Sequence, residues 1–577
     1  MQLKNHLLLQ QPGLDCNSTR ENQGIETFLQ QIHFMRHWIL LIFLFIFLNG
    51  CRNVSEDEKG RTVFRYNEAA NITSLDPAYA RDQANIWAVH QVFSGLVQLN
   101  EKLEILPCIA KSWEISDDGK EYTFHLRNDV FFHDNQAFIG GKGRRVTASD
   151  FIYSFNRIVD PGNASPGSWV FNYVTLQNDR YMFTALNDTT LVICLRNPFP
   201  PFLGLLSTMY CSVVPIEAVM HYGNDFRKNP VGTGPFMFRM WKEGVKLVLL
   251  KNPSFFEFDN GTRLPYLDAV AITFLPDKQS AFLEFMKGRL DFISGIESSY
   301  KDELLTRNGT LNPRHTHKIK LITQPYLNTE YLGFLVDPGL KKTNTDPVTS
   351  RKVRQAINYA FDRVKMIEFL RNNIGTPGTG GIIPKGMPSF DPGKINYQFD
   401  PDKARQLLRE AGYPNGIGLP VITLSTTSDY LDICKYIQRQ VEEIGITLKI
   451  DIVQPAALKE MKAQAKVSFF RASWIADYPD EENYLSLFYS RNFCPKGPNY
   501  THFSDKTFDI LYEKSMSITV DSVRQKYYRQ MDQIIMQEAP VVILYYDQVL
   551  RFVRKGIEGL GSDPMNMLSL KRVRKEI

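Results

Sequence analysis

The sequence has few cysteines and almost no excess charge of either sign. Its 577 residues include seven cysteines, and none is spaced as Cys-x-x-Cys, which argues against a zinc ribbon and a thioredoxin-type redox centre. Sixty-seven Lys and Arg against 62 Asp and Glu leave a formal net charge of +5. Over this length such a charge is too small for an electrostatic footprint on nucleic acid, so no nucleic-acid partner is expected.

The motifs of common hydrolases and nucleotide-binding enzymes are also missing. The sequence contains no Gly-x-Ser-x-Gly, no His-Glu-x-x-His, no Walker loop and no long Gly-rich dinucleotide loop. His315 and His317 have no Cys nearby and are expected to be solvated. The glycine-rich run from Gly140 to Arg145, with three basic residues, favours a mobile surface loop over an anion site. We therefore expect no catalytic residue, no metal and no cofactor.

The chain is long enough for several domains. At about 150 residues per domain, its length corresponds to three to four of them. The composition is 43% hydrophobic and 22% charged, which is typical of soluble globular proteins, and aromatic residues are frequent at 12%. Long disordered or coiled-coil regions are therefore not expected.

A segment near the start of the sequence has the pattern of an export signal. A charged beginning at Met35, an apolar run over residues 39–48 and the ending Asn49-Gly50-Cys51 form the pattern of a secretory signal. The apolar run has about half of the roughly 20 residues that a membrane-spanning helix needs. Leu48 to Cys51 resembles the lipobox of bacterial lipoproteins, in which the cysteine is lipidated, although Asn49 is unusual there. The alternative is a free Cys51 thiol after an uncleaved anchor.

The first 60 residues are accordingly divided into three parts. Residues 1–34 are expected to be a non-structural extension or the result of a misassigned start, residues 35–50 a lipoprotein signal peptide, and residues 51–60 a polar tether. The folded body is expected to begin near Arg61.

The body alternates helices and strands. A capping box at Thr147 to Asp150 predicts a helix that ends before Pro161, and Asp400 with Pro401 predicts the start of another. The alternation of apolar residues predicts a strand over residues 122–126. The order strand, helix, strand after residue 420 points to an α/β domain. We also predict one helix after Ser350 that carries Val353 to Ile367, and a last helix after Asp521 followed by a strand over residues 541–546.

Several long stretches resemble the solute-binding proteins of bacterial peptide ABC importers, the oligopeptide- and dipeptide-binding lipoprotein family. The most specific is Lys111-Ser112-Trp113-Glu114 followed by Asp117-Asp118-Gly119-Lys120, the strand over 122–127, Phe132-His133-Asp134 and Thr147-Ala148-Ser149-Asp150. Others, in the family's order, are Leu75-Asp76-Pro77, Gly232-Thr233-Gly234-Pro235-Phe236, Arg354 to Arg363 and Ala411-Gly412-Tyr413-Pro414. Extra residues around Phe138 to Arg145 and the lack of an Asn within Gly333 to Val336 depart from the family pattern.

The resemblance implies an α/β type II periplasmic-binding-protein fold with two hinged lobes and an additional inserted domain. Its layout assigns residues 61–94, 212–334 and 540–577 to domain I, 95–211 to domain II and 335–539 to domain III, the peptide-binding lobe. It further implies an extracytoplasmic protein, a monomer, held at the membrane by the lipid on Cys51.

The resemblance also suggests ligand contacts. Asp477 is similar to the family's acceptor of the peptide amino terminus, although Asp480 or Glu481 could take that role. Arg471 matches an arginine that can meet the peptide carboxylate through a bidentate pair. Three aromatic residues are candidate pocket walls, each weighed against ordinary burial, and these are Trp474, Trp169 and Tyr546.

The function that follows is the capture of short peptides and their delivery to an ABC permease with its ATPase subunits, without enzymatic activity. Within this class the alternative ligands are a murein peptide, a metal chelate, haem and a sugar. An extracytoplasmic chaperone and a lipid-anchored peptidase are further alternatives. Five cysteines remain in the body, an odd number, so at least one is expected to be free or paired between molecules; Cys194 and Cys211 could bridge.

Overall fold

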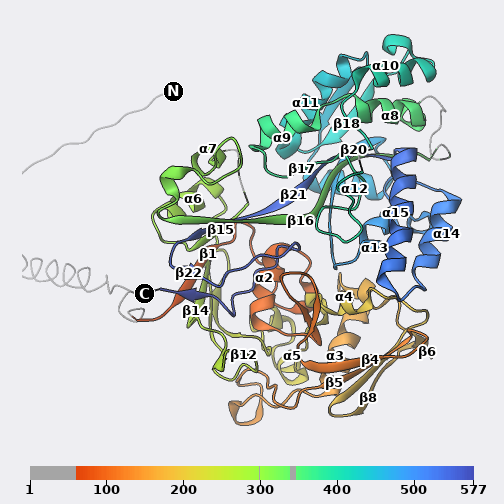
Figure 1. Ribbon diagram of the computed structural model, residues 1–577. Coiled ribbons are helices and arrows are strands. Elements are labelled where there is room, and N and C mark those ends of the chain that lie inside the picture. Colours follow the sequence, from red (N-terminus) through yellow and green to blue (C-terminus); the bar gives the residue numbers. More distant parts are fainter. Residues whose placement is uncertain are drawn as a thin grey trace, which may run out of the picture. The chain divides into compact units, whose positions relative to one another are not determined.

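The computed structural model describes residues 60–576 except 296, 298, 338, 340–345 and 395 (Figure 1). The compact unit begins at Arg61. The predicted extension, signal peptide and lipidated Cys51, and the tether up to residue 59, lie outside the described residues. Within the described ranges, no helix is both long and apolar enough to cross a bilayer.

An eleven-stranded sheet runs through the molecule. Its strand order is β10-β11-β14-β1-β15-β21-β16-β20-β18-β19, and β17 pairs with β21 as a side branch. The strands are β1 (Val63–Asn67), β10 (Phe236–Lys242), β11 (Lys246–Lys251), β14 (Ala269–Thr273), β15 (Phe292–Ser294), β16 (Ile319–Phe334), β17 (Thr376–Pro377), β18 (Ile422–Thr426), β19 (Leu448–Ile452), β20 (Phe469–Ile475) and β21 (Val541–Arg554). Parallel and antiparallel pairs both occur, as in many α/β proteins.

Helices cover both faces of one half of this sheet (Figure 1). Along β21, Val541 and Ile543 belong to a core with α14 (Lys506–Ser515) and α15 (Asp521–Glu538). Val542 and Leu544 belong to a second core with α8 (Arg351–Tyr359), α10 (Pro401–Glu410) and α11 (Leu431–Glu442). Successive strand residues point to opposite faces, so an unbroken apolar run fits a strand buried on both sides. This half is therefore a helix–sheet–helix sandwich.

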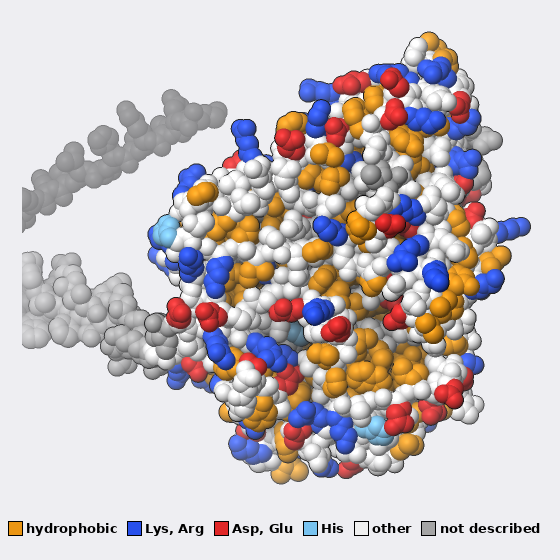
Figure 2. All heavy atoms as spheres, in the orientation of Figure 1, with side chains coloured by type: hydrophobic (Ala, Val, Ile, Leu, Met, Phe, Trp, Pro, Cys, Tyr) orange, Lys and Arg blue, Asp and Glu red, His pale blue; other side chains and the backbone are white. Residues whose placement is uncertain are grey.

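The remaining helices are α2 (Gln83–Val92), α3 (Ala148–Val159), α4 (Phe202–Leu206), α5 (Ile216–Tyr222), α6 (Lys278–Met286), α7 (Lys301–Leu304), α9 (Arg363–Arg371), α12 (Pro455–Ala463) and α13 (Glu482–Leu485). Charged side chains of both signs are interspersed over the face shown in Figure 2.

The prediction of a single helix after Ser350 was wrong. The structure has two helices, α8 and α9, which are separated by Ala360 to Asp362. Asp362 has an extended backbone, and its carboxylate accepts hydrogen bonds from the N–H groups of Val364 and Lys365, both at 3.0 Å. This N-cap starts a new helix inside a pattern whose apolar spacing continues across the break.

A separate four-stranded antiparallel sheet has the order β4-β5-β9-β8. Its strands are β4 (Ala110–Ile115), β5 (Glu121–Leu126), β8 (Phe183–Asn187) and β9 (Thr190–Cys194). Short two-stranded ribbons are formed by β2 (Val97–Leu99) with β3 (Ile105–Pro107), β6 (Leu176–Gln177) with β7 (Arg180–Tyr181), β12 (Phe258–Asp259) with β13 (Thr262–Arg263), and β22 (Ile557–Glu558) with β23 (Arg574–Lys575). The predicted strand over 122–126 is confirmed as β5.

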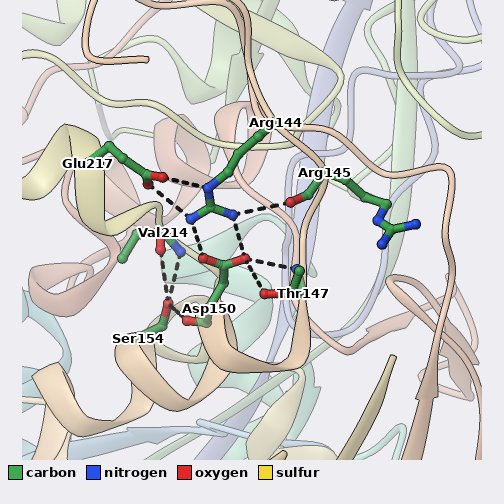
Figure 3. Close-up of polar contacts among 7 residues, drawn as sticks. All are labelled: Arg144, Arg145, Thr147, Asp150, Ser154, Val214 and Glu217. Atoms are coloured by element: carbon green, nitrogen blue, oxygen red, sulfur yellow. Dashed lines mark hydrogen bonds and ion pairs between the residues drawn. The ribbon is translucent and has the colours of Figure 1, made fainter. Parts of the chain in front are cut away.

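The predicted capping box at the start of α3 is confirmed, and it carries an ion pair that the sequence did not predict (Figure 3). Asp150 accepts from the N–H of Thr147 at 2.8 Å and binds Arg144 in a bidentate pair at 2.6 and 2.8 Å. The same guanidinium binds Glu217 at 2.5 and 2.9 Å. Because two carboxylates already neutralise Arg144, this residue of the glycine-rich run is not a free anion ligand.

Strands β16 and β21 change register along their length. Residues 319–325 of β16 pair with Arg554 to Gln548, whereas residues 329–333 pair with Tyr546 to Val541. The shift between Pro325 and Thr329 leaves Tyr326, Leu327 and Asn328 outside the ladder with β21. An irregularity of this kind bends a strand and redirects its side chains, and Tyr326 lines the cavity described next.

Candidate functional site

A cavity of about 800 Å³ opens beside the register shift. This volume lies within the range of about 300–1,000 Å³ that is common for small-molecule sites. The lining residues fall within 80–108, 207–210, 235–257, 475–477 and 559–572, together with Trp169 and Tyr326. Segments that lie hundreds of residues apart in the sequence therefore share one site.

Asp477 reaches this cavity from the loop that follows β20. The N–H of Asp477 donates to Oδ1 of Asn483 at 3.1 Å, and Nδ2 of Asn483 donates to the Asp477 carboxylate at 3.4 Å. Asn483 is 4% exposed on α13, so its amide provides a fixed support. In the described part of the chain, no Lys or Arg forms an ion pair with Asp477. Its carboxylate therefore faces the cavity without a counter-charge.

The electrostatic state of Asp477 reflects this setting. Its side chain is exposed within the cavity, and protein atoms surround it on the other sides. Desolvation raises the pKa of Asp477 to about 6, and the hydrogen bond from Asn483 opposes the rise. A cationic group entering the cavity would favour the ionised form.

Aromatic side chains form part of the wall. Trp169, on the short helix Ser168–Phe171, lines the cavity, and its ring centroid lies 6.2 Å from that of Tyr478. Tyr210 and Tyr326 also line it. Burial, and secondarily Asp477, raises the pKa of Tyr210 to about 12, so its hydroxyl stays protonated as a donor near the acid. The sequence analysis missed both tyrosines, because its only signal for them was the high aromatic content.

A different part of the wall carries a closed polar cluster. Nζ of Lys571 donates to both carboxylate oxygens of Glu257, at 2.7 and 2.9 Å, and to Oε1 of Gln98 at 2.7 Å. Burial, with a smaller effect of Lys571, lowers the pKa of His90 to about 4, so that this imidazole is neutral at pH 7. These charges are compensated within the protein, in contrast to Asp477.

Arg471 does not line the cavity. Its guanidinium forms an ion pair with Glu330 of β16, and its Cζ lies 3.3 Å from the ring centroid of Tyr430. Glu330 is only 3% exposed at its side chain, and removing Arg471 from it would leave that carboxylate buried without a partner. In this structure Arg471 therefore neutralises the buried Glu330 carboxylate.

The other two aromatic candidates also lie outside the lining. Trp474 donates from Nε1 to Oδ1 of Asn483 at 2.7 Å, so it helps to hold the residue that supports Asp477. Tyr546 is 1% exposed, and its hydroxyl donates to the carbonyl of Gly381 at 2.7 Å. Of the five candidates, the structure brings Asp477 and Trp169 together at the cavity and leaves Arg471, Trp474 and Tyr546 outside its lining.

Behind this wall, Glu482 is buried with two tyrosines. It is 1% exposed, and its carboxylate accepts from the hydroxyls of Tyr478 and Tyr512. Burial raises the pKa of Glu482 to about 7, which the two hydrogen bonds only partly offset. The folded protein thus binds this proton more tightly than the unfolded chain. The stabilising contribution is complete below about pH 4.5 and is lost as the pH rises through 7.

We expect the isosteric change Glu482→Gln to stabilise the protein at pH 8 by about 1–3 kcal/mol, because the amide carries no buried charge. Its oxygen accepts from one tyrosine hydroxyl, and its NH2 group donates to the oxygen of the other once that hydroxyl has turned. At pH 4.5 the difference from the native protein should nearly vanish. Denaturant unfolding of both proteins at the two pH values measures it. A destabilised variant at pH 8 would contradict the assignment of Glu482 as a charge buried at a cost.

The cysteines and histidines singled out in the sequence are placed as follows. Cys108, Cys194, Cys211, Cys434 and Cys494 are all free, so Cys194 and Cys211 do not form a bridge in this structure. The expectation that His315 is solvated was wrong, because it is 8% exposed and lies 2.9 Å from Glu303. Among the described residues, no group of three or more His, Cys, Asp or Glu is arranged to hold a metal.

Comparison with known proteins identifies relatives along most of the chain. Residues 104–493 match the family described as bacterial extracellular solute-binding proteins, family 5 middle region. Heme-binding protein A of Haemophilus influenzae is 30% identical over 468 residues, which cover 78% of this chain and 80% of that protein. The dipeptide-binding protein of Escherichia coli is 26% identical over 478 residues, 80% of this chain and 84% of that protein.

A solved structure agrees with these matches. The periplasmic binding protein DppA of Helicobacter pylori, associated with an ABC transporter and in complex with the peptide STSA, has a TM-score of 0.73 and 26% sequence identity. The alignment covers 91% of this chain and all of that one. The predicted type II periplasmic-binding-protein fold with two lobes and mixed α/β content is confirmed. The relatives are substrate-binding proteins and not enzymes, as the sequence predicted.

Proposed function

Because this chain belongs to the bacterial extracellular solute-binding proteins of family 5, which serve ABC importers, we propose that its ligands are short peptides. The observation that carries the proposal is the uncompensated Asp477 carboxylate in a cavity of about 800 Å³. A peptide amino terminus is a cation at neutral pH, and burying it requires a counter-charge. Asp477 supplies that charge.

The proposed binding mode uses few fixed contacts. The amino terminus meets Asp477, Asn483 holds the carboxylate in place, and Trp169 and Tyr210 form flat apolar walls against the first side chains. The remainder of the peptide lies extended and pairs with main-chain groups, which gives affinity with little dependence on sequence. Trp474 supports the site indirectly, through its hydrogen bond to Asn483.

The predicted domains give this site a closing motion. Residues 61–94, 212–334 and 540–577 (domain I) and residues 335–539 (domain III) would form the jaws, with residues 95–211 (domain II) attached to the first. The cavity takes lining from both proposed jaws, for example Trp87 from one and Asp477 from the other. A ligand that contacts both jaws shifts the population toward the closed state.

We further propose that the protein acts as a monomer held at the membrane by a lipid on Cys51, where the closed form meets the permease and its ATPases. Haem is the second candidate ligand, favoured by the 30% identity with a heme-binding protein. A murein peptide, a metal chelate or a chaperone role would use the same cavity.

Native mass spectrometry of the protein purified from a bacterial host tests the proposal. We expect a ladder of co-purified short peptides that are released intact on denaturation. A bound species with the absorbance of haem would favour the second candidate. If the purified protein carried no ligand and also bound nothing from a mixed pool of peptides, the peptide proposal would be overturned.

A further inference from the structure

Cys494 faces a histidine, a contact that none of the other four described cysteines makes. Its Sγ lies 3.2 Å from Nε2 of His502, and Nδ1 of His502 lies 3.4 Å from Oδ2 of Asp337. The three side chains converge from separate segments of the chain, because Asp337 follows β16 whereas Cys494 and His502 flank a loop after α13. A thiol, an imidazole and a carboxylate therefore stand in line.

The two partners of the imidazole use its opposite nitrogens. A single metal ion could not be bound by all three groups in this arrangement, since each ring nitrogen already faces a different side chain. The line instead has the connectivity of a nucleophile, a base and a group that orients the base. The carboxyl group of Asp337 beside Nδ1 favours the tautomer with its hydrogen on Nδ1, which leaves the lone pair of Nε2 directed to the thiol.

Further contacts hold the imidazole ring in place. The ring of Phe493 stacks on it with centroids 4.5 Å apart and 9° between the planes. The carbonyl oxygen of Cys494 lies 3.2 Å from Nε2 and can accept its hydrogen once this nitrogen is protonated. His502 is 8% exposed, so these partners largely replace water around it.

We propose that Cys494, His502 and Asp337 form a nucleophilic thiol site whose substrates are small disulfides. Cys494 Sγ attacks one sulfur of the disulfide R–S–S–R, and His502 Nε2 takes the thiol proton. The S–S bond of the reagent breaks, a new S–S bond joins Cys494 to one R–S group, and the departing R–S⁻ receives the proton from His502 as R–SH. The disulfide is the oxidant, so electrons and atoms balance without a further reactant.

The position of the thiol restricts the size of the substrate. Cys494 is only 4% exposed, but it lies next to the exposed Pro495 and Lys496 and is therefore near the surface. Only a small reagent is expected to reach its sulfur. Burial raises the pKa of the Cys494 thiol, which keeps it neutral at rest and makes a base necessary at the moment of attack. Sγ also lies 3.4 Å from the carbonyl of Lys462, and the backbone N–H of Ala465 and the side chain of Tyr500 are near it. Burial lowers the pKa of the Lys462 ammonium to about 8.

The test is the rate at which the folded protein reacts with 2-hydroxyethyl disulfide at pH 7, resolved by peptide mapping with mass spectrometry. We expect Cys494 to be thiolated at least about tenfold faster than the more exposed Cys194, and His502→Gln to slow it at least about tenfold, the low end of general-base effects. His125→Gln, at a histidine paired with Glu114 on the β-sheet surface, is the matched control and should change nothing.

A second measurement covers the case in which His502→Gln fails to fold. In the native protein, the rate at Cys494 should rise by clearly less than tenfold per pH unit, because the thiol proton passes to a neighbouring base and not to hydroxide. A rate that rises tenfold per pH unit up to pH 9 would indicate an unassisted thiol and overturn the proposal. So would a Cys494 that stays unmodified while Cys194 reacts, or equal rates in the native protein and in His502→Gln.

Discussion

Asp477→Asn should weaken the binding of peptides with a free amino terminus by about 2–5 kcal/mol, the cost of breaking a desolvated charge pair. Among the described residues, no Lys or Arg forms an ion pair with the Asp477 carboxylate, so the ligand ammonium would be its counter-charge. The amide keeps the size of the side chain and its contact with Asn483. Calorimetric titration of a set of peptides measures the loss.

The same interaction should appear in the pH dependence of the native protein. Because burial raises the pKa of Asp477 to about 6, the unliganded carboxyl gains a proton as the pH falls below that value. Affinity should then weaken by up to tenfold per pH unit. Above about pH 8 it should weaken again, because the α-amino group loses its charge. In Asp477→Asn, the loss of affinity at low pH should disappear. The loss above about pH 8 should be small, because no carboxylate pairs with the α-amino group.

Two controls separate the charge pair from general damage. Peptides acetylated at the amino terminus should lose much less than free ones when Asp477 is replaced. Asp402→Asn, at a carboxylate that is 92% exposed on α10, should bind all peptides normally. Equal losses for free and acetylated peptides would remove Asp477 from the amine role.

Local sequence signals predicted the elements well where a cap or an alternation defines them. The capping box before α3, the Asp400 cap of α10 and the alternation in β5 all reappear in the structure. The break at Asp362 was missed because the apolar spacing of α8 continues into α9. The length of β21 was missed because only its first six residues form a continuous apolar run.

The site was predictable only in part, and the reason is physical. Asp477 and Trp169 were found through resemblance to family segments, and both line the cavity. Tyr210 and Tyr326 lie in segments whose local pattern gives no sign of a ligand, and only the register shift of β16 places Tyr326 at the cavity. The diversion of Arg471 to Glu330 depends on the pairing of β16 with β20, which no local pattern encodes.

Asp76→Asn should destabilise the folded protein by about 3–5 kcal/mol, because it leaves a buried guanidinium without its counter-charge. Asp76 binds Arg157 at 2.7 and 3.3 Å, and the two side chains are only 5% and 12% exposed. The Asp76 carboxylate also accepts from the N–H of Ala78 at 3.0 Å, a contact that the amide can keep. The expected loss of stability therefore measures the charge pair with Arg157 and not the hydrogen bond from Ala78. Guanidinium unfolding curves, compared at equal slope, measure it.

Arg157 can be neutralised as well, and the result identifies the cause of that loss. Adding Arg157→Met to Asp76→Asn should recover most of the stability, since replacing both members of a buried pair is often close to neutral. Asp129→Asn is the exposed counterpart: its pair with Arg127 is 51% and 33% exposed and should be worth less than about 1 kcal/mol. If Asp76→Asn lowered the free energy of unfolding as little as Asp129→Asn, the Asp76–Arg157 pair would not be desolvated. If the double variant were no better than the single one, the hydrogen bonds of Asp76, and not its charge, would be what stabilises this corner of the fold.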